Sequence, residues 1–473
     1  MGKDLRSFIR DLIAARPGEV KRVSAPVDPR FGATAIAERF ARDTQYPALY
    51  FEKIGESSIP LVLNLTATFE RLAVALGTTL QEMVPAFGER MTKPIAARDV
   101  PRDAAPVKEQ VWTGADVDLG RLPLLTHNEL DGGAYVTSGI GIMRDPESGA
   151  INAGLYRHQV YSRNELGVWF IDGHHGNYIY RRYEERGQPA PIAIAIGHHP
   201  AVVMGAVCRL PGIGGEFDAA GALLGEAVEV TRAETCDVPV PARAEIVIEG
   251  EVLPHERRHE GPFGEWPGHY TAEGPKPVIR VKAITMRRNP IYYDVFSANR
   301  EHLVLGSLPR MGSIYRNVKA IVPGLRAVNV PAHSRMHCYL SIKKTRDSEV
   351  KKAAFAALNT EPENLKMVVV VDDDINVFND GEVMWAIGTR FDAARDLLVI
   401  PRWSGPGGLL PVGWDYHDDG TRTPRMITAT IIDATKPLPP AAFPPRAVVP
   451  ASAVDAASIS GITDLTGLPD ESA

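Results

Sequence analysis

The stretch Ile151-Asn-Ala-Gly-Leu-Tyr-Arg-His-Gln-Val160 lies about a third of the way along a 473-residue chain and is typical of a β-strand that carries polar side chains. Similar short runs, separated by glycine and proline, lie on both sides of it: Ala134–Ser138, Ile192–Ile196 and Ala244–Ile248. Many short strands with turn residues between them are typical of barrels and sandwiches. Residues from about 115 to 315 are therefore predicted to form a β-barrel or a β-sandwich.

The residues before this region predict a mixed α/β unit. Residues 4–15 carry apolar side chains at helical spacing behind Asp4, an expected N-cap, and Pro17-Gly18 ends the pattern. A short apolar strand is expected over 59–63, and residues 66–77 have the pattern of a capped helix that a glycine closes. Helices and strands therefore alternate from residue 1 to about 110.

The residues after about 320 predict a second α/β domain. Residues 352–358 and 381–390 are helix-like, and Val368–Val371 is typical of a buried strand. Beyond Lys436 the chain is rich in proline, alanine and serine, which is typical of a docking arm or of a disordered segment.

The composition excludes several classes of protein. Hydrophobic residues make up 44% and charged residues 23%, so disorder throughout and collagen-like repetition are excluded. A formal net charge of -6 offers no general attraction to nucleic acid or to an anionic membrane. No apolar run approaches the roughly 18 residues of a membrane helix. The chain has three scattered cysteines, Cys208, Cys236 and Cys338, which are too few for a disulfide framework. The cytoplasm is therefore the expected compartment.

Asn152, His175 and Glu216 together offer an amide oxygen, an imidazole nitrogen and a carboxylate. This set suits octahedral Mn²⁺ or Mg²⁺ and leaves coordination positions for phosphate oxygens and water. Such a site would hold a phosphorylated cofactor through its metal. The alternative is a strand asparagine, a surface histidine pair and a helix-capping glutamate, since isolated residues of these types usually have no ligand role.

The segment Glu260-Gly-Pro-Phe-Gly-Glu265 predicts a tight non-helical turn that presents two carboxylates toward one place. A guanidinium such as Arg157 would keep one carboxylate ionised. Burial and like charge would then disfavour ionisation of the other, so that it could hold a proton for delivery. The alternative is an exposed acidic turn that pairs with Arg257 and Arg258.

Two further polar motifs have weaker links to chemistry. Asp372-Asp-Asp374 follows a predicted strand and could bind Mg²⁺, although acids at a strand end also cap turns and helices. His198-His199-Pro200 ends an apolar strand and fits a turn better than a pair of metal ligands.

The order of these segments resembles that of the UbiD-type decarboxylases, which use prenylated FMN. The matching motifs are Asn152-x4-Arg157, His175, Glu216-x3-Ala-Gly-x-Leu-x-Gly and Glu260-Gly-Pro-Phe-Gly-Glu265. Further matching segments are Leu5–Ile9, Pro60–Leu65, Glu70–Ala73, Val371–Ile375, Glu382–Ala386 and Asp433–Pro437. The resemblance therefore covers about residues 4 to 437.

The resemblance implies an α+β multidomain fold. Residues 1–115 would form an N-terminal α/β domain, and residues 116–318 a split β-barrel of the flavin-reductase type that binds prenylated FMN. Residues 319–440 would form a C-terminal α/β domain. The Pro/Ala-rich tail over 441–473 is a candidate oligomer-docking arm on its composition alone. A homodimer or homohexamer and a flavin prenyltransferase that supplies the cofactor are implied as well.

The resemblance also implies roles for individual residues. The family's metal positions fall on Asn152, His175 and Glu216, which would clamp the cofactor phosphate through Mn²⁺ or Mg²⁺, with K⁺ nearby. The flavin would be lined by Leu155, Tyr156, Arg157 and His174. The family's catalytic network falls on Arg157, Glu260 and Glu265, with Glu265 as the proton donor.

The reaction that the resemblance implies is the reversible loss of CO₂ from a (hetero)aromatic or α,β-unsaturated acid through a covalent prenylated-FMN adduct. The cofactor takes up an electron pair that an sp² carbon cannot stabilise. His302 and Arg310 could bind a second carboxylate or a ring heteroatom, which resembles the furan-2,5-dicarboxylate branch. A helix cap with a surface ion pair is the alternative, and a phenolic or heteroaromatic monoacid also fits.

Two features depart from the expected pattern. Asn152 and Arg157 are five residues apart, so a straight strand would aim them at opposite faces unless Gly154 forms a bulge or the long arginine side chain wraps round. A lysine that some members place before the Asp433 motif has no clear counterpart. Two rival functions stay open: a Mg²⁺-dependent phosphohydrolase that uses Asp372 and Asp374, and a non-catalytic flavin- or metal-binding assembly subunit.

Overall fold

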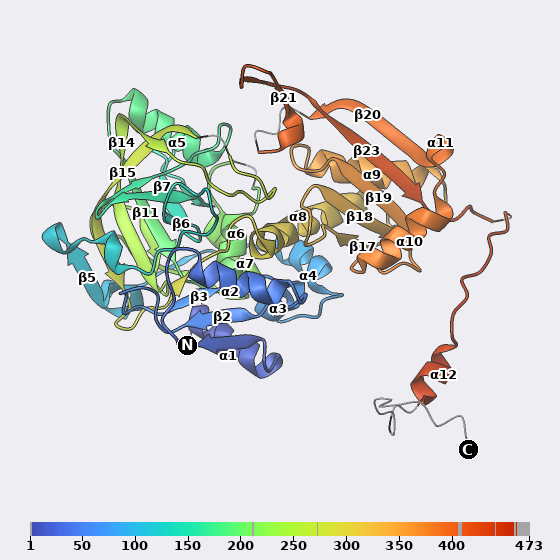
Figure 1. Ribbon diagram of the computed structural model, residues 1–473, viewed down its shortest axis with the longest axis horizontal. Coiled ribbons are helices and arrows are strands. Elements are labelled where there is room, and N and C mark those ends of the chain that lie inside the picture. The colour runs from blue at the N-terminus through green and yellow to red at the C-terminus, as the bar shows by residue number, and fades with distance from the viewer. Residues whose placement is uncertain are drawn as a thin grey trace, which may run out of the picture. The chain divides into compact units, whose positions relative to one another are not determined.

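A nine-stranded antiparallel sheet is built from strands between residues 110 and 286 in the computed structural model, which describes residues 2–210, 212–271, 273–404, 409–439, 441–457 and 460 (Figure 1). Its strands are β5 (Gln110–Thr113), β6 (Tyr135–Val136), β7 (Ile140–Arg144), β8 (Ile151–Leu155), β9 (His158–Ser162), β10 (Glu165–Gly167), β11 (Ala190–Ile196), β14 (Ile246–Glu260) and β15 (Gly274–Met286). They are ordered β6-β9-β10-β15-β14-β11-β7-β8, and β5 pairs with β15. Among the described residues no pairing joins β6 to β8, so this sheet is not a closed barrel.

Strand β11 shows why this sheet is stable. Its side chains alternate between two apolar clusters. Ile192 and Ile194 belong to the same cluster as Ile246 and Ile248 of β14, whereas Ala193 and Ala195 belong to the other. Both faces of the strand are therefore covered, and each cluster adds apolar area removed from water.

The N-terminal residues form a second, mixed sheet with helices against it. Its strands are β1 (Val20–Val23), β2 (Ala48–Phe51), β3 (Leu61–Leu63) and β16 (Tyr292–Tyr293), and the helices are α1 (Leu5–Ala15), α2 (Gly32–Ala41), α3 (Phe69–Leu76) and α4 (Met83–Arg90). The predicted cap of α1 is confirmed, because the Asp4 side chain accepts a hydrogen bond from the Ser7 amide. Helix α3 begins later than predicted, since Thr68 rather than Thr66 is its N-cap.

Residues 325–434 form a five-stranded mixed sheet ordered β17-β18-β19-β23-β20. The strands are β17 (Leu325–Asn329), β18 (His337–Ile342), β19 (Met367–Asp372), β20 (Leu397–Ser404) and β23 (Ile427–Ala434). The accompanying helices are α9 (Ser348–Thr360), α10 (Asp380–Arg390) and α11 (Ala393–Asp396), and β21 (Trp414–Tyr416) pairs with β22 (Arg422–Pro424) as a separate ribbon. The predicted strand at Val368–Val371 is confirmed as the buried β19.

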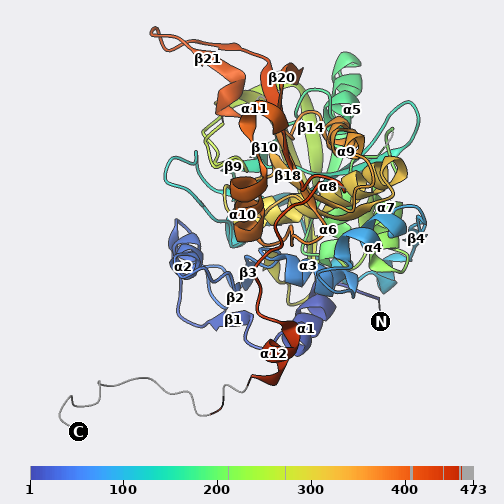
Figure 2. The same cartoon turned by 90° about the vertical axis from the view of Figure 1, so that its right-hand side faces the viewer.

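Three helices begin at or next to the polar motifs, and a small three-stranded sheet lies in the same part of the chain. The helices are α5 (His175–Glu185), α6 (Pro200–Ala206) and α7 (Glu216–Leu224), and the sheet contains β4 (Arg98–Asp99), β12 (Glu229–Arg232) and β13 (Pro239–Pro241). In both ribbon views α1, α3 and α4 lie below β14 and α5 (Figure 1, Figure 2).

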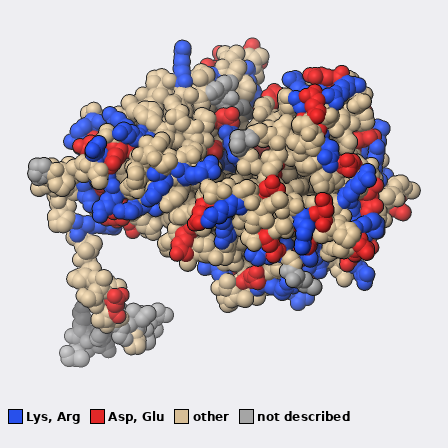
Figure 3. Space-filling view, turned by 180° about the vertical axis from the view of Figure 1, so that it is seen from behind, with Lys and Arg blue, Asp and Glu red and all other residues tan. Residues whose placement is uncertain are grey.

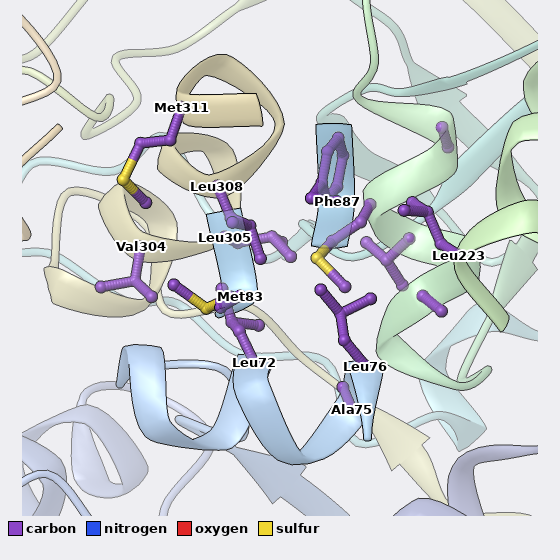
Figure 4. Packing of buried hydrophobic residues seen from close by; sticks show 14 of the residues in the cluster. Leu72, Ala75, Leu76, Met83, Phe87, Leu223, Val304, Leu305, Leu308 and Met311 are labelled. Atoms are coloured by element: carbon purple, nitrogen blue, oxygen red, sulfur yellow. The ribbon is translucent and has the colours of Figure 1, made fainter. Parts of the chain in front are cut away.

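Helix α8 (Arg300–Ile321) joins these parts, because it contacts α3, α4, α6, α9 and β17. Figure 4 shows Val304, Leu305 and Leu308 of α8 facing residues of α3 and α4. At Gly312 a Cβ atom would lie 2.2 Å from the Phe87 ring, so only glycine allows this helix contact. The helix that follows the Glu260–Glu265 segment in the chain is thus anchored in the largest apolar cluster.

Residues 1–435 are one unit, and residues 436–473 form a second unit, which contains the short exposed helix α12 (Ala451–Ala456). The predicted docking arm or disordered tail over 441–473 lies in part outside the described residues. Lysine and arginine are intermixed with aspartate and glutamate on the face drawn in Figure 3. No described helix is long and apolar enough to cross a bilayer. The α/β multidomain prediction is confirmed, whereas the domain boundaries stay predictions.

Candidate active site

Arg157 is bonded to both acids of the Glu260–Glu265 turn. Its Nε and Nη2 atoms donate to the two carboxylate oxygens of Glu260 at 2.9 and 2.8 Å. Its Nη1 atom donates to Glu265 Oε1 at 3.2 Å and to Thr271 Oγ1 at 2.9 Å. The predicted arginine-flanked pair of acids therefore exists as one hydrogen-bonded unit.

This unit is buried between aromatic rings. Arg157 Cζ lies 4.2 Å from the Trp169 ring centroid and 4.8 Å from that of Phe263. Only 1% of Glu260 and 8% of Glu265 are exposed. The alternative of an exposed acidic turn is therefore wrong, and the two arginines assigned to it pair elsewhere: Arg257 with Glu184, and Arg258 with Glu165.

The unit combines one cation with two carboxyl groups. Burial by itself would lower the pKa of Arg157, but the hydrogen bonds and the charge of Glu260 outweigh burial and raise it. One permanent cation thus faces two carboxyl groups. The unit carries one net negative charge when both acids are ionised and none when one of them is protonated, which suits a buried site that exchanges one proton.

The position of Arg157 follows from a corner between two strands. Strand β8 ends at Leu155 and β9 begins at His158, so Tyr156 and Arg157 lie outside both strands. Gly154 pairs with Gly141 in a ladder that shows no register shift, so the bulge considered at Gly154 is absent. The residues predicted as one strand over 151–160 form two strands, β8 and β9. The alternation of side chains along a single strand therefore does not fix the directions of Asn152 and Arg157 relative to each other.

Two side chains outside the turn hold its backbone, and neither was predicted from the sequence. Gln159 Oε1 accepts from the amide of Gly261, next to Glu260, at 3.0 Å. Asp131 Oδ1 accepts from the amide of Gly264, next to Glu265, at 2.9 Å. Asp131-Gly-Gly is a recognisable turn signal, but nothing in the sequence marks Gln159, because its role depends on tertiary contact.

The predicted metal ligands lie on three elements that converge. Asn152 of β8 donates from Nδ2 to Glu216 Oε1 at 3.0 Å, and Tyr156 donates to Asn152 Oδ1 at 3.0 Å. Glu216 and His175 are the first residues of α7 and α5, and the charge of His175 acts on Glu216. Tyr156 thus contacts the Asn152 group while Arg157, the next residue, contacts Glu260.

A cavity of about 410 Å³ opens at His175, although neither Asn152 nor Glu216 lines it. It is lined by Gly173, His174, His175, Asn177, Tyr178, Arg181 and Ile213. Helix α5 begins in this lining, its N-cap His174 makes no capping hydrogen bond, and its first turn carries no acid. A helix N-terminus without a side-chain cap, beside a cavity that Arg181 also lines, is a suitable place for a phosphate group.

Glu216 provides the test of whether a cation fits here. The side chain is 4% exposed, and its Oε2 atom is buried without a hydrogen-bond partner. Burial raises the pKa of this carboxyl group, although Asn152 and neighbouring amides oppose the effect. An unpartnered buried oxygen beside an amide and an imidazole fits a metal ion. No group of three or more described His, Cys, Asp or Glu side chains forms such a site by itself.

The predicted substrate residues both lie on α8. Arg310 forms an ion pair of 3.3 Å with Glu361. His302 Nδ1 is buried without a hydrogen-bond partner, and burial lowers the pKa of this imidazole to about 4 despite the charge of Glu265. Leu155, predicted to line the flavin, is half-buried at the end of β8. The surface ion pair considered for Arg310 is wrong, because Glu361 is 3% exposed.

The two weaker motifs are occupied by internal contacts. Arg390 forms ion pairs with Asp372 at 2.9 Å and with Asp374 at 2.8 Å, so the geometry gives no support to a Mg²⁺ phosphohydrolase. His199 is the N-cap of α6, as expected for a turn, and its Nδ1 accepts from the Ala201 amide at 3.2 Å.

Comparison with known proteins finds one family whose domain models match most of the chain. The models of the N-terminal, Rift-related central and C-terminal domains of 3-octaprenyl-4-hydroxybenzoate carboxy-lyase (UbiD) match residues 13–91, 98–300 and 303–406. The anhydromevalonate phosphate decarboxylase of Methanothermobacter thermautotrophicus is 33% identical over 418 residues, which cover 88% of this chain and 94% of the relative.

Two solved structures are similar over almost the whole chain. An evolved dimeric form of the UbiD-class enzyme HmfF from Pelotomaculum thermopropionicum, in complex with prFMN, has a TM-score of 0.86 and 34% identity, with coverage of 97% of this chain and 99% of that one. The apo 3,4-dihydroxybenzoic acid decarboxylase AroY of Klebsiella pneumoniae has a TM-score of 0.86 and 29% identity, with coverage of 96% and 99%.

Proposed function

This chain belongs to the UbiD family of prenylated-FMN-dependent carboxy-lyases, and from that premise we propose that it catalyses the reversible, non-oxidative decarboxylation of a (hetero)aromatic or α,β-unsaturated carboxylic acid. The observation that carries the proposal is the buried unit in which Arg157 is hydrogen-bonded to Glu260 and Glu265. Such a unit can hold one proton away from water, as protonation of a carbon atom requires.

Glu265 is the proposed proton donor. Glu260 accepts two hydrogen bonds from Arg157 and is thereby held as the carboxylate partner. Glu265 accepts only one from Arg157, while its Oε2 accepts from the Trp266 amide at 3.1 Å. As the carboxylic acid, Glu265 gives its proton to the carbon that has lost CO₂, and Arg157 stabilises the carboxylate that remains. In the reverse direction Glu265 accepts the proton from that carbon.

The proposed cofactor site is the convergence of Asn152, His175 and Glu216. These residues would hold Mn²⁺ or Mg²⁺, with K⁺ nearby, and the metal would bind the phosphate of prenylated FMN beside the N-terminus of α5. Leu155, Tyr156 and His174 would line the flavin. When bound, prenylated FMN supplies an electron sink for the electron pair that CO₂ leaves behind.

The remaining details of the proposal rest on the family alone. The nine-stranded sheet would act as the split barrel that binds the flavin, a flavin prenyltransferase would supply the cofactor, and the chain would assemble as a homodimer or homohexamer in the cytoplasm. Furan-2,5-dicarboxylate stays a candidate substrate, with His302 and Arg310 near its second carboxylate.

The experiment that tests the proposal is co-expression with a flavin prenyltransferase. The purified chain should carry prenylated FMN by mass spectrometry and release CO₂ from at least one member of a panel of aromatic, heteroaromatic and α,β-unsaturated acids. The same chain made without the prenyltransferase should release none. A fully loaded chain that is inactive on the whole panel would favour the non-catalytic assembly subunit instead.

A further inference from the structure

Lys276 of β15 is a cation beside the Glu260–Glu265 turn that has no role in the proposed reaction so far. In the ladder between β14 and β15, Glu260 stands directly opposite Gly274, and Arg258 stands opposite Lys276. Opposite residues of an antiparallel pair share a face of the sheet, and so do alternate residues of one strand. Glu260 and Lys276 therefore lie on the same face, on a diagonal that a long side chain can span.

Gly274 leaves the space into which the lysine side chain extends. A Cβ atom at Gly274 would lie 4.0 Å from Lys276 Nζ. The ammonium group therefore lies beside the ladder position that faces Glu260, at the point where β14 ends and β15 begins. These two strand ends close the loop that carries Glu265, so the cation stands at the base of that loop.

The ring of Trp169 lies next to both cations of this region. Its centroid is 4.2 Å from Arg157 Cζ and 5.6 Å from Lys276 Nζ. The face of an indole ring attracts cations. Trp169 therefore helps to keep the ammonium group of Lys276 near the acid pair.

The charges that act on Lys276 belong to the acid pair and its arginine. Burial lowers the pKa of Lys276, the charge of Glu260 opposes burial, and the charge of Arg157 adds to it. The residue directly opposite in the ladder is engaged elsewhere, because Arg258 pairs with Glu165 at 2.8 Å. The half-buried ammonium group and the acid pair therefore interact through space.

Other titratable side chains also face the two acids. Tyr135 and Tyr161 interact with the charge of Glu260, and burial raises the pKa of both phenols, so both are neutral at pH 7. The charge of Glu265 acts on His302, whose pKa burial lowers to about 4, and on Arg335, which stays protonated. None of these four groups changes its charge near neutral pH.

The proposed reaction gives the site a use for a second cation. Decarboxylation converts a substrate carboxylate and one proton into CO₂ and a C–H bond, so Glu265 becomes a carboxylate in every turnover. Two carboxylates then face Arg157, which balances the charge of only one of them. The state after proton transfer is thus one positive charge short of neutrality.

We propose that Lys276 is a positioning residue that acts through its charge: its ammonium group balances the second carboxylate, which appears when Glu265 gives up its proton. Arg157, Lys276 and the two acids then carry no net charge after the transfer. The free energy of the carboxylate form of Glu265 is thereby lowered, which makes Glu265 a better proton donor. This inference rests on the proposed function for the direction of proton transfer.

The test measures the pH at which Glu265 loses its proton. Infrared difference spectra of the full chain, prepared without cofactor, detect protonated carboxyl groups, and the spectra of Glu265→Gln identify the band of Glu265. Wild type is compared with Lys276→Met, Lys276→Arg and the control Lys282→Met, which removes an exposed lysine of the same strand that pairs with Glu251. In cofactor-loaded protein, the pH dependence of kcat/KM gives a second measure.

Lys276→Met should raise the midpoint of the Glu265 titration by about 0.5 pH units or more, because the loss of a nearby cation disfavours the carboxylate. Lys276→Arg keeps the cation and should retain the wild-type midpoint. Lys282→Met should retain it as well, since a distant exposed charge is screened by salt. The alkaline limb of kcat/KM should move to higher pH in Lys276→Met alone. A purely structural role would not make the arginine variant behave as wild type.

The inference is overturned if Lys276→Met has the wild-type midpoint, or if Lys276→Arg shifts it as far as Lys276→Met does. It is also overturned if both Lys276→Met and Lys276→Gln fail to fold, because Lys276 would then be a structural residue. The infrared shift in a loaded chain that decarboxylates nothing would retain the charge effect and reject the proposed function. Decarboxylation without any infrared shift would do the reverse.

Discussion

Arg157 forms two parallel hydrogen bonds with Glu260, of 2.9 and 2.8 Å, in a site where only 1% of Glu260 is exposed. Its single bond to Glu265 is longer, at 3.2 Å. The two acids are therefore held unequally by one cation. This inequality supports the proposed division of roles, in which Glu260 keeps the arginine in place and Glu265 moves the proton.

Arg157→Met should abolish both activity and much of the stability. Removal of one partner of a buried ion pair costs about 3–5 kcal/mol, because the other charge stays buried without compensation. Turnover should fall at least about 100-fold, the lower end of what positioned acid–base groups contribute. Urea denaturation and CO₂ release measure the two effects. Arg258→Met, which breaks a more exposed pair with Glu165, should cost no more than about 1 kcal/mol.

Gln159→Leu should lower kcat more than it changes KM. The variant leaves the Gly261 amide without its acceptor, at a cost of about 1–3 kcal/mol, and lets the backbone beside Glu260 move. Steady-state kinetics and urea denaturation measure the effect. Gln110→Leu removes a comparable side chain that donates to the Arg287 carbonyl away from the site, so it should leave kcat unchanged. Equal loss of kcat in both variants would argue against a positioning role.

Glu216→Gln should reduce metal and cofactor content together. The substitution keeps the size of the side chain but replaces a carboxylate with a weaker neutral metal ligand, so bound metal should fall at least about tenfold. Elemental analysis and flavin absorbance of co-expressed protein measure both quantities. Glu226→Gln, just beyond the end of α7, is the matched control. Normal metal content in Glu216→Gln would mean that the cation binds elsewhere.

Lowering the pH from 7 to 5 should destabilise the protein, in a range above the usual pKa values of carboxyl groups. Burial lowers the pKa of His199 to about 3, and the charge of His198 adds to the effect. Between pH 6.5 and 3 the unfolded chain binds a proton at this residue that the folded chain does not, so stability falls as the pH falls. From pH 7 to pH 5 the loss from His199 alone is about 2 kcal/mol.

His199→Asn keeps a capping side chain and cannot titrate in this range, so its free energy of unfolding should fall less between pH 7 and pH 5 than that of wild type. Urea denaturation at both pH values measures the difference. His255→Asn, at a largely exposed histidine, should retain the wild-type slope. An unchanged slope in His199→Asn would show that His199 does not contribute to the acid sensitivity.

Local signals predicted much of the fold. Asp4 caps α1, the valines of 368–371 form the buried β19, and Gly77 closes α3 in the left-handed conformation. These features depend on neighbours in the sequence, through capping, apolar patterning and backbone freedom. The division of residues 151–160 into two strands was missed, because it depends on which strands lie beside β8 and β9.

The site was predictable in its ionisable motifs but not in its supports. Arg157, Glu260 and Glu265 come together as expected, and Asn152 contacts Glu216. Gln159 and Trp169 carry no local signature, since each acts through residues elsewhere in the sequence. Their roles became visible only when β-strand pairing placed them beside the turn and Arg157.

The central claim is that Glu265, held by Arg157, delivers the proton. It is tested most directly by CO₂ release per bound cofactor in Glu265→Gln, at a chromophore content equal to that of wild type and with Glu273→Gln, at an exposed glutamate, as the control. The account predicts that Glu265→Gln retains the cofactor and loses about 100-fold or more of its turnover, while Glu273→Gln is unaffected. Turnover within a few-fold of wild type in fully loaded Glu265→Gln would contradict it.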